Sequence, residues 1–256
     1  MKIITLLLIS CLAGCALFSE EGDETTKLTI DQIYAQAKEA MNDGSYETAI
    51  KLYEALEARD PFGKYAQQAQ LDIIYAYYKY QEPDSALTAA ARFIKLYPRH
   101  PRIDYAYYLK GLVNFELNAG LFDRFLPLDK SQRDQTAAMN AFNGFSDLIT
   151  RFPDSKYSED ARQRMVYLRN ILADYELHAA RFYLERGAFV AAANRAKKVV
   201  ESYQRTPAVP EALVILAKTY KIMSLADLYT STLRVLKLNY PDYPGIQEVE
   251  NLAVKG

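Results

Sequence analysis

The placement of proline constrains the fold of this chain more than any other feature of the sequence. All ten prolines fall between apolar segments in which hydrophobic residues recur every three or four positions. Proline stops a helix because it lacks an N–H group and its ring clashes with the preceding turn. No segment alternates apolar and polar residues as a half-buried strand does. The sequence therefore predicts an all-α fold.

Several similar apolar segments, called phrases below, end in proline, and their spacing indicates a repeat. Pro98, Pro153 and Pro241 close three such phrases, and Pro61 closes a looser one. Pro61 and Pro98 lie 37 residues apart, whereas Pro98 and Pro153 lie 55 apart, which is one repeat plus an insertion of 18. The residue twelve positions before Pro61, Pro98 and Pro153 is an alanine in each case: Ala49, Ala86 and Ala141.

The segments that begin at Gly44 and Gly187 share the turn and second-helix signature of a tetratricopeptide repeat, which is about 34 residues long. Glycine permits the tight turn, and a following alanine lets the paired helices approach closely. A non-repetitive helical bundle is the weaker alternative, because four matches fall in phase. We predict a tetratricopeptide-repeat solenoid of about five helix pairs. The pairs lie near residues 31–62, 64–99, 101–154, 173–206 and 207–242, with a long helical stretch from Ser158 to about Ala173 before the fourth.

The first fifteen residues have the pattern of a secretory signal. Lys2 precedes a short apolar run, which ends in Leu12-Ala13-Gly14-Cys15. The run is too short to span a bilayer, which needs about 20 apolar residues. Its last four residues resemble a bacterial lipobox. This resemblance implies removal of residues 1–14 as a signal peptide and acylation of Cys15, for example with palmitate.

The residues that follow Cys15 add two expectations. Ala16, in place of aspartate, implies sorting to the outer membrane if the organism is Gram-negative. Residues 15–29 are polar and acidic without periodicity, so we expect a lipidated flexible tether. An ordinary cleaved signal with an incidental cysteine is the alternative.

The charges and the rare reactive residues exclude several classes of function. The formal charge is −1, with 31 basic against 32 acidic residues, so the chain lacks the basic excess that nucleic-acid binding requires. Both cysteines lie in the first fifteen residues, and the two histidines, His100 and His178, belong to no metal or catalytic motif. No set of residues in the sequence has the pattern of a hydrolase active site. We expect no enzyme, no metal and no cofactor besides the covalent lipid on Cys15.

The first helix of each tetratricopeptide pair lines the concave groove, so groove residues can be predicted. We place Ala37, Ile74 and Gly111 where the paired helices cross. Tyrosine offers rigid contact area and lysine suits a terminal carboxylate, so the resulting stripe favours an extended peptide with aromatic side chains. The alternative that the tyrosines fill a narrow interior stays open. The stripe comprises Tyr34, Lys38, Met41, Asn42, Leu71, Tyr75, Tyr78, Lys79, Tyr105, Tyr108, Leu112 and Phe115.

Two further features suit partner binding. The insertion, residues 119–136, has an apolar half and a charged half, and we favour its tucking into the superhelix over its acting as a partner clip. Basic residues gather in the C-terminal half of the chain. A solvated helix face explains most of them, but a patch that binds an acidic protein surface is the alternative. Its predicted members are Arg186, Arg195 and Lys198.

Several phrases, in their order along the chain, resemble the BamD family of lipoproteins in the outer-membrane β-barrel assembly machine (the BAM complex). The likeness extends from about Ile33 to Val200 and includes the lipobox. It departs from the family at Lys130, where arginine is usual, and in a divergent last repeat. The phrases include Pro61-Phe62-Gly63, Ile74-Tyr75-Ala76-Tyr77-Tyr78, His100-Pro101, Asp129-Lys130-Ser131 and Glu185-Arg186-Gly187.

The resemblance implies a lipid-anchored scaffold on the periplasmic face of the outer membrane. Its N-terminal repeats, in residues 30–154, would recognise the C-terminal signals of unfolded outer-membrane proteins. Its C-terminal repeats, in residues 155–242, would bind the POTRA domain of a BamA-like barrel subunit and accessory lipoproteins. Residues 243–256 would form a tail. The alternative is a purely structural tetratricopeptide scaffold without direct substrate recognition.

Overall fold

The computed structural model describes residues 24–119 and 135–253 of the chain. Every regular element among these residues is a helix, which confirms the predicted all-α fold. None of the helices in this part of the chain is both long and apolar enough to cross a membrane. The chain divides into two compact units, one up to Ala89 and one from Ala90, and the boundary falls within α5 (Pro83–Leu96).

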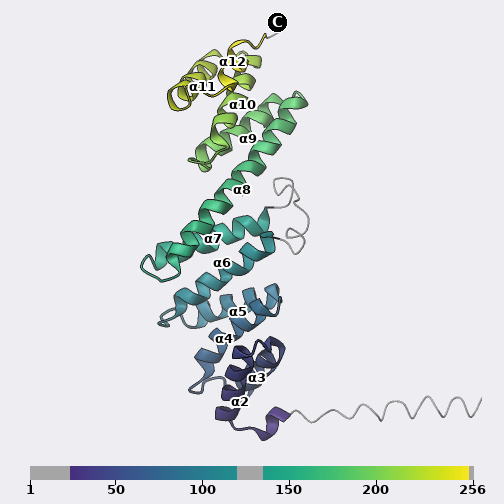
Figure 1. The fold of residues 1–256 in the computed structure, drawn as a ribbon, viewed down its shortest axis with the longest axis vertical. Coiled ribbons are helices and arrows are strands. Elements are labelled where there is room, and N and C mark those ends of the chain that lie inside the picture. Colours follow the sequence, from purple (N-terminus) through teal and green to yellow (C-terminus); the bar gives the residue numbers. More distant parts are fainter. Residues whose placement is uncertain (1–23, 120–134, 254–256) are drawn as a thin grey trace, which may run out of the picture. The chain divides into compact units, whose positions relative to one another are not determined.

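The first unit begins with the short helix η2 (Glu24–Lys27) and ends with the start of α5. Between them lie the pair α2 (Ile30–Asn42) and α3 (Tyr46–Arg59), and then α4 (Ala66–Lys79) (Figure 1). Thr29 begins α2 with a capping box: its hydroxyl accepts a hydrogen bond from the Gln32 N–H, and the Gln32 side chain accepts one from the Thr29 N–H. The helix α3 packs against both α2 and α4 around a shared apolar core.

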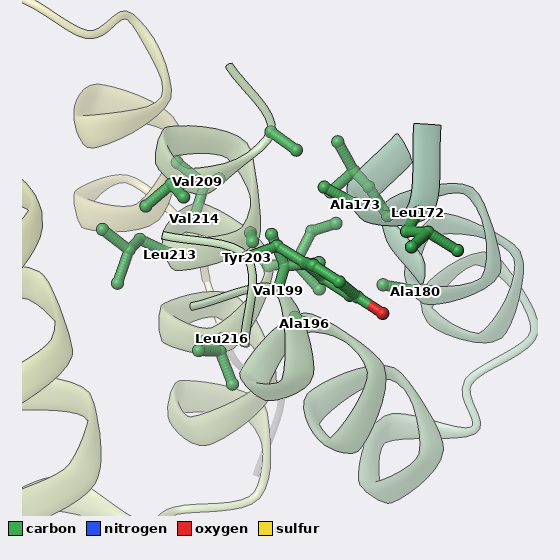
Figure 2. Packing of buried hydrophobic residues seen from close by; sticks show 14 of the residues in the cluster. Leu172, Ala173, Ala180, Ala196, Val199, Tyr203, Val209, Leu213, Val214 and Leu216 are labelled. Carbon is green, nitrogen blue, oxygen red and sulfur yellow. The ribbon is translucent and has the colours of Figure 1, made fainter. Parts of the chain in front are cut away.

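The second unit continues the succession of packed helices. Neighbouring helices contact each other from α6 to α11, and α12 packs on α10 and α11. Figure 2 shows the part of their core where the Tyr203 ring lies among apolar side chains of α8, α9 and α10. This succession is the helical repeat that the sequence predicts. Its helices are α6 (Ile103–Ala119), α7 (Thr136–Arg151), α8 (Ser158–Glu185), α9 (Phe189–Ser202), α10 (Val209–Ile222), α11 (Ala226–Asn239) and α12 (Gly245–Glu250).

The turn inside a helix pair has the same backbone conformation at four places. The second residue after the first helix is left-handed in each: φ is 76° at Gly44, 64° at Gln81, 71° at Gly187 and 58° at Ser224. The next residue donates its N–H to the carbonyl five positions earlier, at 2.8–2.9 Å. This is the bond of a Schellman helix end. The sequence signature identified the turn at the two glycines and missed it at Gln81 and Ser224.

A proline stands two residues after the second helix of four pairs, α5 before Pro98 among them. The helices α3, α7 and α11 stop before Asp60, Phe152 and Tyr240, and each of these residues precedes a proline. Their φ angles are −144°, −135° and −140°, outside the helical range, because proline disfavours a helical conformation in the residue before it. Between Pro153 and Pro207 there is no such stop. The predicted helical stretch from Ser158 therefore runs without a break into the first helix of the fourth pair, as α8.

The residues placed at helix crossings, Ala37, Ile74 and Gly111, are all buried. A Cβ atom on Gly111 would lie 2.6 Å from the Phe145 ring, and one on Gly144 would lie 3.2 Å from the Gly111 Cα. The helices α6 and α7 therefore approach so closely that any side chain at Gly111 would displace Phe145. The alanines that precede the prolines are fully buried as well: Ala49, Ala86 and Ala141.

Two segments that were expected to be a tether and a tail are partly folded. Within 15–29, η2 is held by Arg59, whose Nη1 donates to the carbonyl oxygens of Thr25 at 2.6 Å and Leu28 at 2.9 Å. Within 243–256, α12 buries Ile246 and Val249. The sequence pattern of so short a helix is too brief to identify. The predicted signal peptide, Cys15 and residues 120–134 of the insertion lie outside the described residues.

Replacing Gln81 with glycine should raise the free energy of unfolding by about 1 kcal/mol, because a left-handed residue with a side chain carries a steric cost that glycine avoids. The matched change Gly44→Ala should lower it by a similar amount. A Cβ atom at Gly44 would meet nothing within 4 Å, so its effect is conformational. Urea denaturation followed by circular dichroism measures both changes. Shifts of the same sign in the two variants would contradict this account of the turns.

Candidate functional site

In the first unit, α2 and the residues just before α4 carry paired aromatic and charged side chains. Tyr34 stacks on Tyr65, with ring centroids 4.1 Å apart and planes 9° apart. The Tyr65 hydroxyl donates to Asp31 Oδ1 at 2.6 Å, and Lys64 forms an ion pair with the same oxygen at 2.5 Å. The predicted groove residue Tyr34 is therefore half-buried, with one face of its ring covered by a residue of the same chain.

Lys38, another predicted groove residue, is bound to a buried carboxylate. Its Nζ lies 3.2 Å from Asp72 Oδ2, and the exposed fractions of the two side chains are 42% and 9%. The Tyr53 hydroxyl donates to the same Asp72 oxygen at 3.4 Å, and Gln68 Nε2 donates to the other at 2.7 Å. Asp72 thus joins α2, α3 and α4. A ligand carboxylate at Lys38 would have to compete with Asp72.

On α3 and α4, three tyrosines and a lysine form a second cluster. The Tyr75 ring meets Tyr46 edge-on at 6.3 Å and lies 6.0 Å from Tyr78. The Nζ of Lys79 lies 5.9 Å from the centroid of the Tyr46 ring. Tyr75 and Tyr78 are half-buried and Lys79 is exposed, so this cluster offers aromatic edges beside a cation. Asn42, at the end of α2, is exposed as well.

The prediction that Leu71 lines an open groove is wrong, because its side chain is completely buried. Leu71 belongs to an unbroken run of six buried residues on α4, from Ala69 to Ile74. A helix covered on several sides hides residues that a one-face pattern assigns to solvent. Leu112, placed in the stripe for the same reason, is also buried.

In the second unit, Tyr105 and Tyr108 of α6 both pack on Tyr157. The centroid distances are 5.3 Å and 4.7 Å, and both pairs are stacked. The Tyr108 hydroxyl donates to Asp160 Oδ2 at 2.9 Å, and Arg164 forms an ion pair with the same oxygen at 2.6 Å. Burial, with a smaller contribution from the bond to Asp160, raises the pKa of Tyr108 from 10.0 to about 12. Both predicted tyrosines thus lie in a ring stack that also braces the start of α8.

The predicted partner-binding residues occupy two different environments. Arg195 and Lys198 of α9 both bind Glu176 of α8, at 2.9 Å and 2.6 Å, and the Glu176 side chain is only 4% exposed. A pocket of about 330 Å³ opens beside these two cations. Arg186 is exposed, and its guanidinium lies 4.2 Å from the centroid of the Phe182 ring. The surface of Arg195 and Lys198 therefore carries one positive charge beyond what Glu176 neutralises.

Sequence reasoning missed the acids and rings that fix these side chains. Tyr65 and Tyr157 each stand four residues after a proline that closes a phrase, Pro61 and Pro153, and each stacks on a tyrosine of the preceding first helix. That shared spacing is a signal that the sequence contains. Asp72 and Glu176 give no such signal, because an acidic residue in an amphipathic helix is normally placed at the surface. Among the described residues, no group of three or more His, Cys, Asp or Glu side chains could hold a metal ion.

Comparison with known proteins decides the family. The model of the family described as YfiO, outer membrane lipoprotein, matches residues 26–236 of the chain. The chain belongs to this family. The match covers every helix pair described above, from α2 to the greater part of α11.

Relatives in three organisms share this similarity over almost their whole length, and each bears the name outer membrane protein assembly factor BamD. The protein of Neisseria gonorrhoeae is 43% identical over 245 residues, which cover 94% of this chain and 92% of the relative. That of Vibrio cholerae is 37% identical over 234 residues, covering 91% and 96%. That of Haemophilus influenzae is 33% identical over 239 residues, covering 93% and 90%.

Replacing Asp72 with asparagine should lower the free energy of unfolding by about 1–3 kcal/mol, because it leaves Lys38 without its counter-charge and weakens the bonds from Tyr53 and Gln68. The control Glu47→Gln removes an exposed carboxylate that also pairs with a lysine, Lys51. It should cost no more than about 0.5 kcal/mol. Chemical denaturation measures both, and equal costs would contradict the structural role of Asp72.

The raised pKa of Tyr108 predicts a loss of stability in alkali. Above pH 10 the unfolded chain gives up the phenolic proton, whereas the folded chain keeps it until about pH 12, so the free energy of unfolding falls across this window. Tyr108→Phe should make that fall shallower. Denaturation midpoints measured from pH 9 to 11.5 test this, and an unchanged pH dependence in the variant would count against it. Tyr229→Phe, at a half-buried tyrosine of α11, is the control.

Proposed function

We propose that this chain is a lipid-anchored, non-catalytic assembly factor of the outer membrane, which binds unfolded outer-membrane proteins and passes them to a β-barrel subunit. Cys15 carries the lipid after removal of residues 1–14, and the folded units face the periplasm. The main supporting observation is the set of aromatic and cationic side chains that α2, α3 and α4 bring together in the first unit. Family membership and the names of the relatives support the same role.

Substrate recognition is assigned to the cluster of Tyr75, Tyr78 and Lys79, with Tyr34, Lys38 and Asn42 beside it on α2. The edges of half-buried tyrosines suit the ring of a C-terminal aromatic residue, since aromatic pairs favour edge-to-face packing. Lys79 is the better cation for the terminal carboxylate, because Lys38 is already engaged by Asp72. Tyr105 and Tyr108 of the second unit offer a similar ring surface, braced by Tyr157.

Partner binding is assigned to Arg186, Arg195 and Lys198. The net positive charge around Glu176 and the exposed guanidinium of Arg186 suit an acidic protein surface. On this proposal the partner is the POTRA domain of a BamA-like subunit, with accessory lipoproteins as further partners. The insertion, of which residues 120–134 lie outside the described part of the chain, contributes no step to this proposal.

The experiment is a titration of the mature protein into a fluorescein-labelled peptide that ends in phenylalanine. Tyr75→Ala and Tyr78→Ala should each weaken binding about five- to thirtyfold, the effect of removing one well-packed aromatic contact. Amidation of the peptide terminus should weaken binding to the wild type and have little effect on Lys79→Ala. Tyr80→Ala, which removes a tyrosine outside this cluster, is the control and should bind normally.

A second arm separates substrate binding from partner binding. Arg186→Glu should lose affinity for the purified POTRA domains of the barrel subunit and keep its affinity for the peptide, whereas the tyrosine variants should show the reverse. If both tyrosine variants bind the peptide as the wild type does, substrate recognition by this cluster is wrong. In that case the purely structural scaffold is the better description.

A further inference from the structure

A pocket of about 330 Å³ lies near the C-terminal end of the second unit and belongs to none of the sites described above. It is lined by the last turn of α8, by one face of α10 and by the start of α12. The residues from α10 stand at positions i, i+3, i+4 and i+7, so they share one stripe of that helix: Glu211, Val214, Ile215 and Lys218.

The four left-handed turn residues allow the repeats to be aligned, and the alignment shows which repeat positions line this pocket. Gly44 and Ser224 occupy the same repeat position, so Val214 corresponds to Tyr34 and Lys218 to Lys38. In the same way, Gly187 aligns with Gln81, so Leu184 corresponds to Tyr78 and Glu185 to Lys79. The pocket is therefore built from the repeat positions that form the aromatic face of the first unit.

The chemistry at these positions differs between the units. The floor of the pocket is aliphatic: Val214 and Ile215 are 4% and 3% exposed, and Leu184 is half-buried. Arg181 binds Glu211 through two nitrogen–oxygen contacts of 2.5 Å and 2.6 Å, and Lys218 binds Glu248 at 2.6 Å. These two pairs fix α8 against α10 and α10 against α12. The pocket is thus held open by ionic contacts around an apolar base.

One charge in the lining is left over. Three carboxylates, of Glu185, Glu211 and Glu248, face two cations, Arg181 and Lys218. Glu211 and Glu248 are in ion pairs, whereas Glu185 is exposed and forms no ion pair with the described residues. The corresponding residue in the first unit is Lys79, so this repeat position is positively charged in the first unit and negatively charged in the second.

We propose that this pocket binds an extended segment of a partner protein that carries a leucine-like side chain followed by a lysine or arginine. The aliphatic side chain occupies the floor of Leu184, Val214 and Ile215, and the basic residue pairs with Glu185. This site is separate from the tyrosine cluster of the first unit and from Arg195, and it does not depend on the proposed function of either.

The test uses two peptides and the full mature protein. Acetyl-Ser-Gly-Leu-Lys-Gly-Ser-amide and the same peptide with glutamate in place of lysine are titrated by NMR, with the amide signals of α8, α10 and α12 as the readout. The lysine peptide should bind about tenfold more tightly, which corresponds to about 1.4 kcal/mol from one attractive and one repulsive contact at the rim. Glu185→Lys should reverse that preference.

Two further variants complete the design. Leu184→Trp should fill the pocket and weaken the binding of both peptides, whereas Lys197→Glu, on the exposed face of α9, should change neither. Glu185 is exposed, so its variant reports on charge even if the tryptophan variant fails to fold. Equal affinities for the two peptides, or a preference for lysine that survives Glu185→Lys, would overturn the proposal.

Discussion

The left-handed turn between paired helices is the constraint on which the rest of the structure depends. At Gly44, Gln81, Gly187 and Ser224 the chain reverses with one hydrogen-bond pattern, so each first helix ends two residues before a fixed point. Residues at equal distances from these points therefore occupy equivalent positions in their helices. This register places Tyr34, Tyr78 and Lys79 of one unit at the same repeat positions as Val214, Leu184 and Glu185 of the other.

The helices and their order could be predicted from the sequence, whereas the surroundings of single side chains could not. Proline stops and small crossing residues act locally, so Pro153 and Gly111 give reliable signals. Burial depends on what packs from several directions, and this is why Leu71 was misplaced. The roles of Asp72 and Glu176 need knowledge of which cations face them across neighbouring helices, and that requires coordinates. The turn at Gln81 could not be predicted, because a glutamine side chain gives no sign of a positive φ.

Basic residues that the sequence presents as available charges are mostly engaged within the chain. Lys38 binds Asp72, Arg195 and Lys198 share Glu176, and Arg181 holds Glu211. A partner that binds these residues exchanges one carboxylate for another, so its net gain is smaller than a count of cations implies. Lys79, Arg186 and Glu185 are more exposed. Each supplies the available charge at one of the three proposed binding sites, positive for Lys79 and Arg186 and negative for Glu185.

Arg59 has a mechanical consequence. Its guanidinium joins the end of α3 to the carbonyl groups of Thr25 and Leu28, just ahead of the capped first turn of α2. Tension applied to the chain before residue 24 therefore reaches the C-terminal end of α3 through this side chain before it can peel α2 open from Thr29. This one guanidinium therefore transfers tension on the preceding chain to α3 and protects the start of α2 from unfolding.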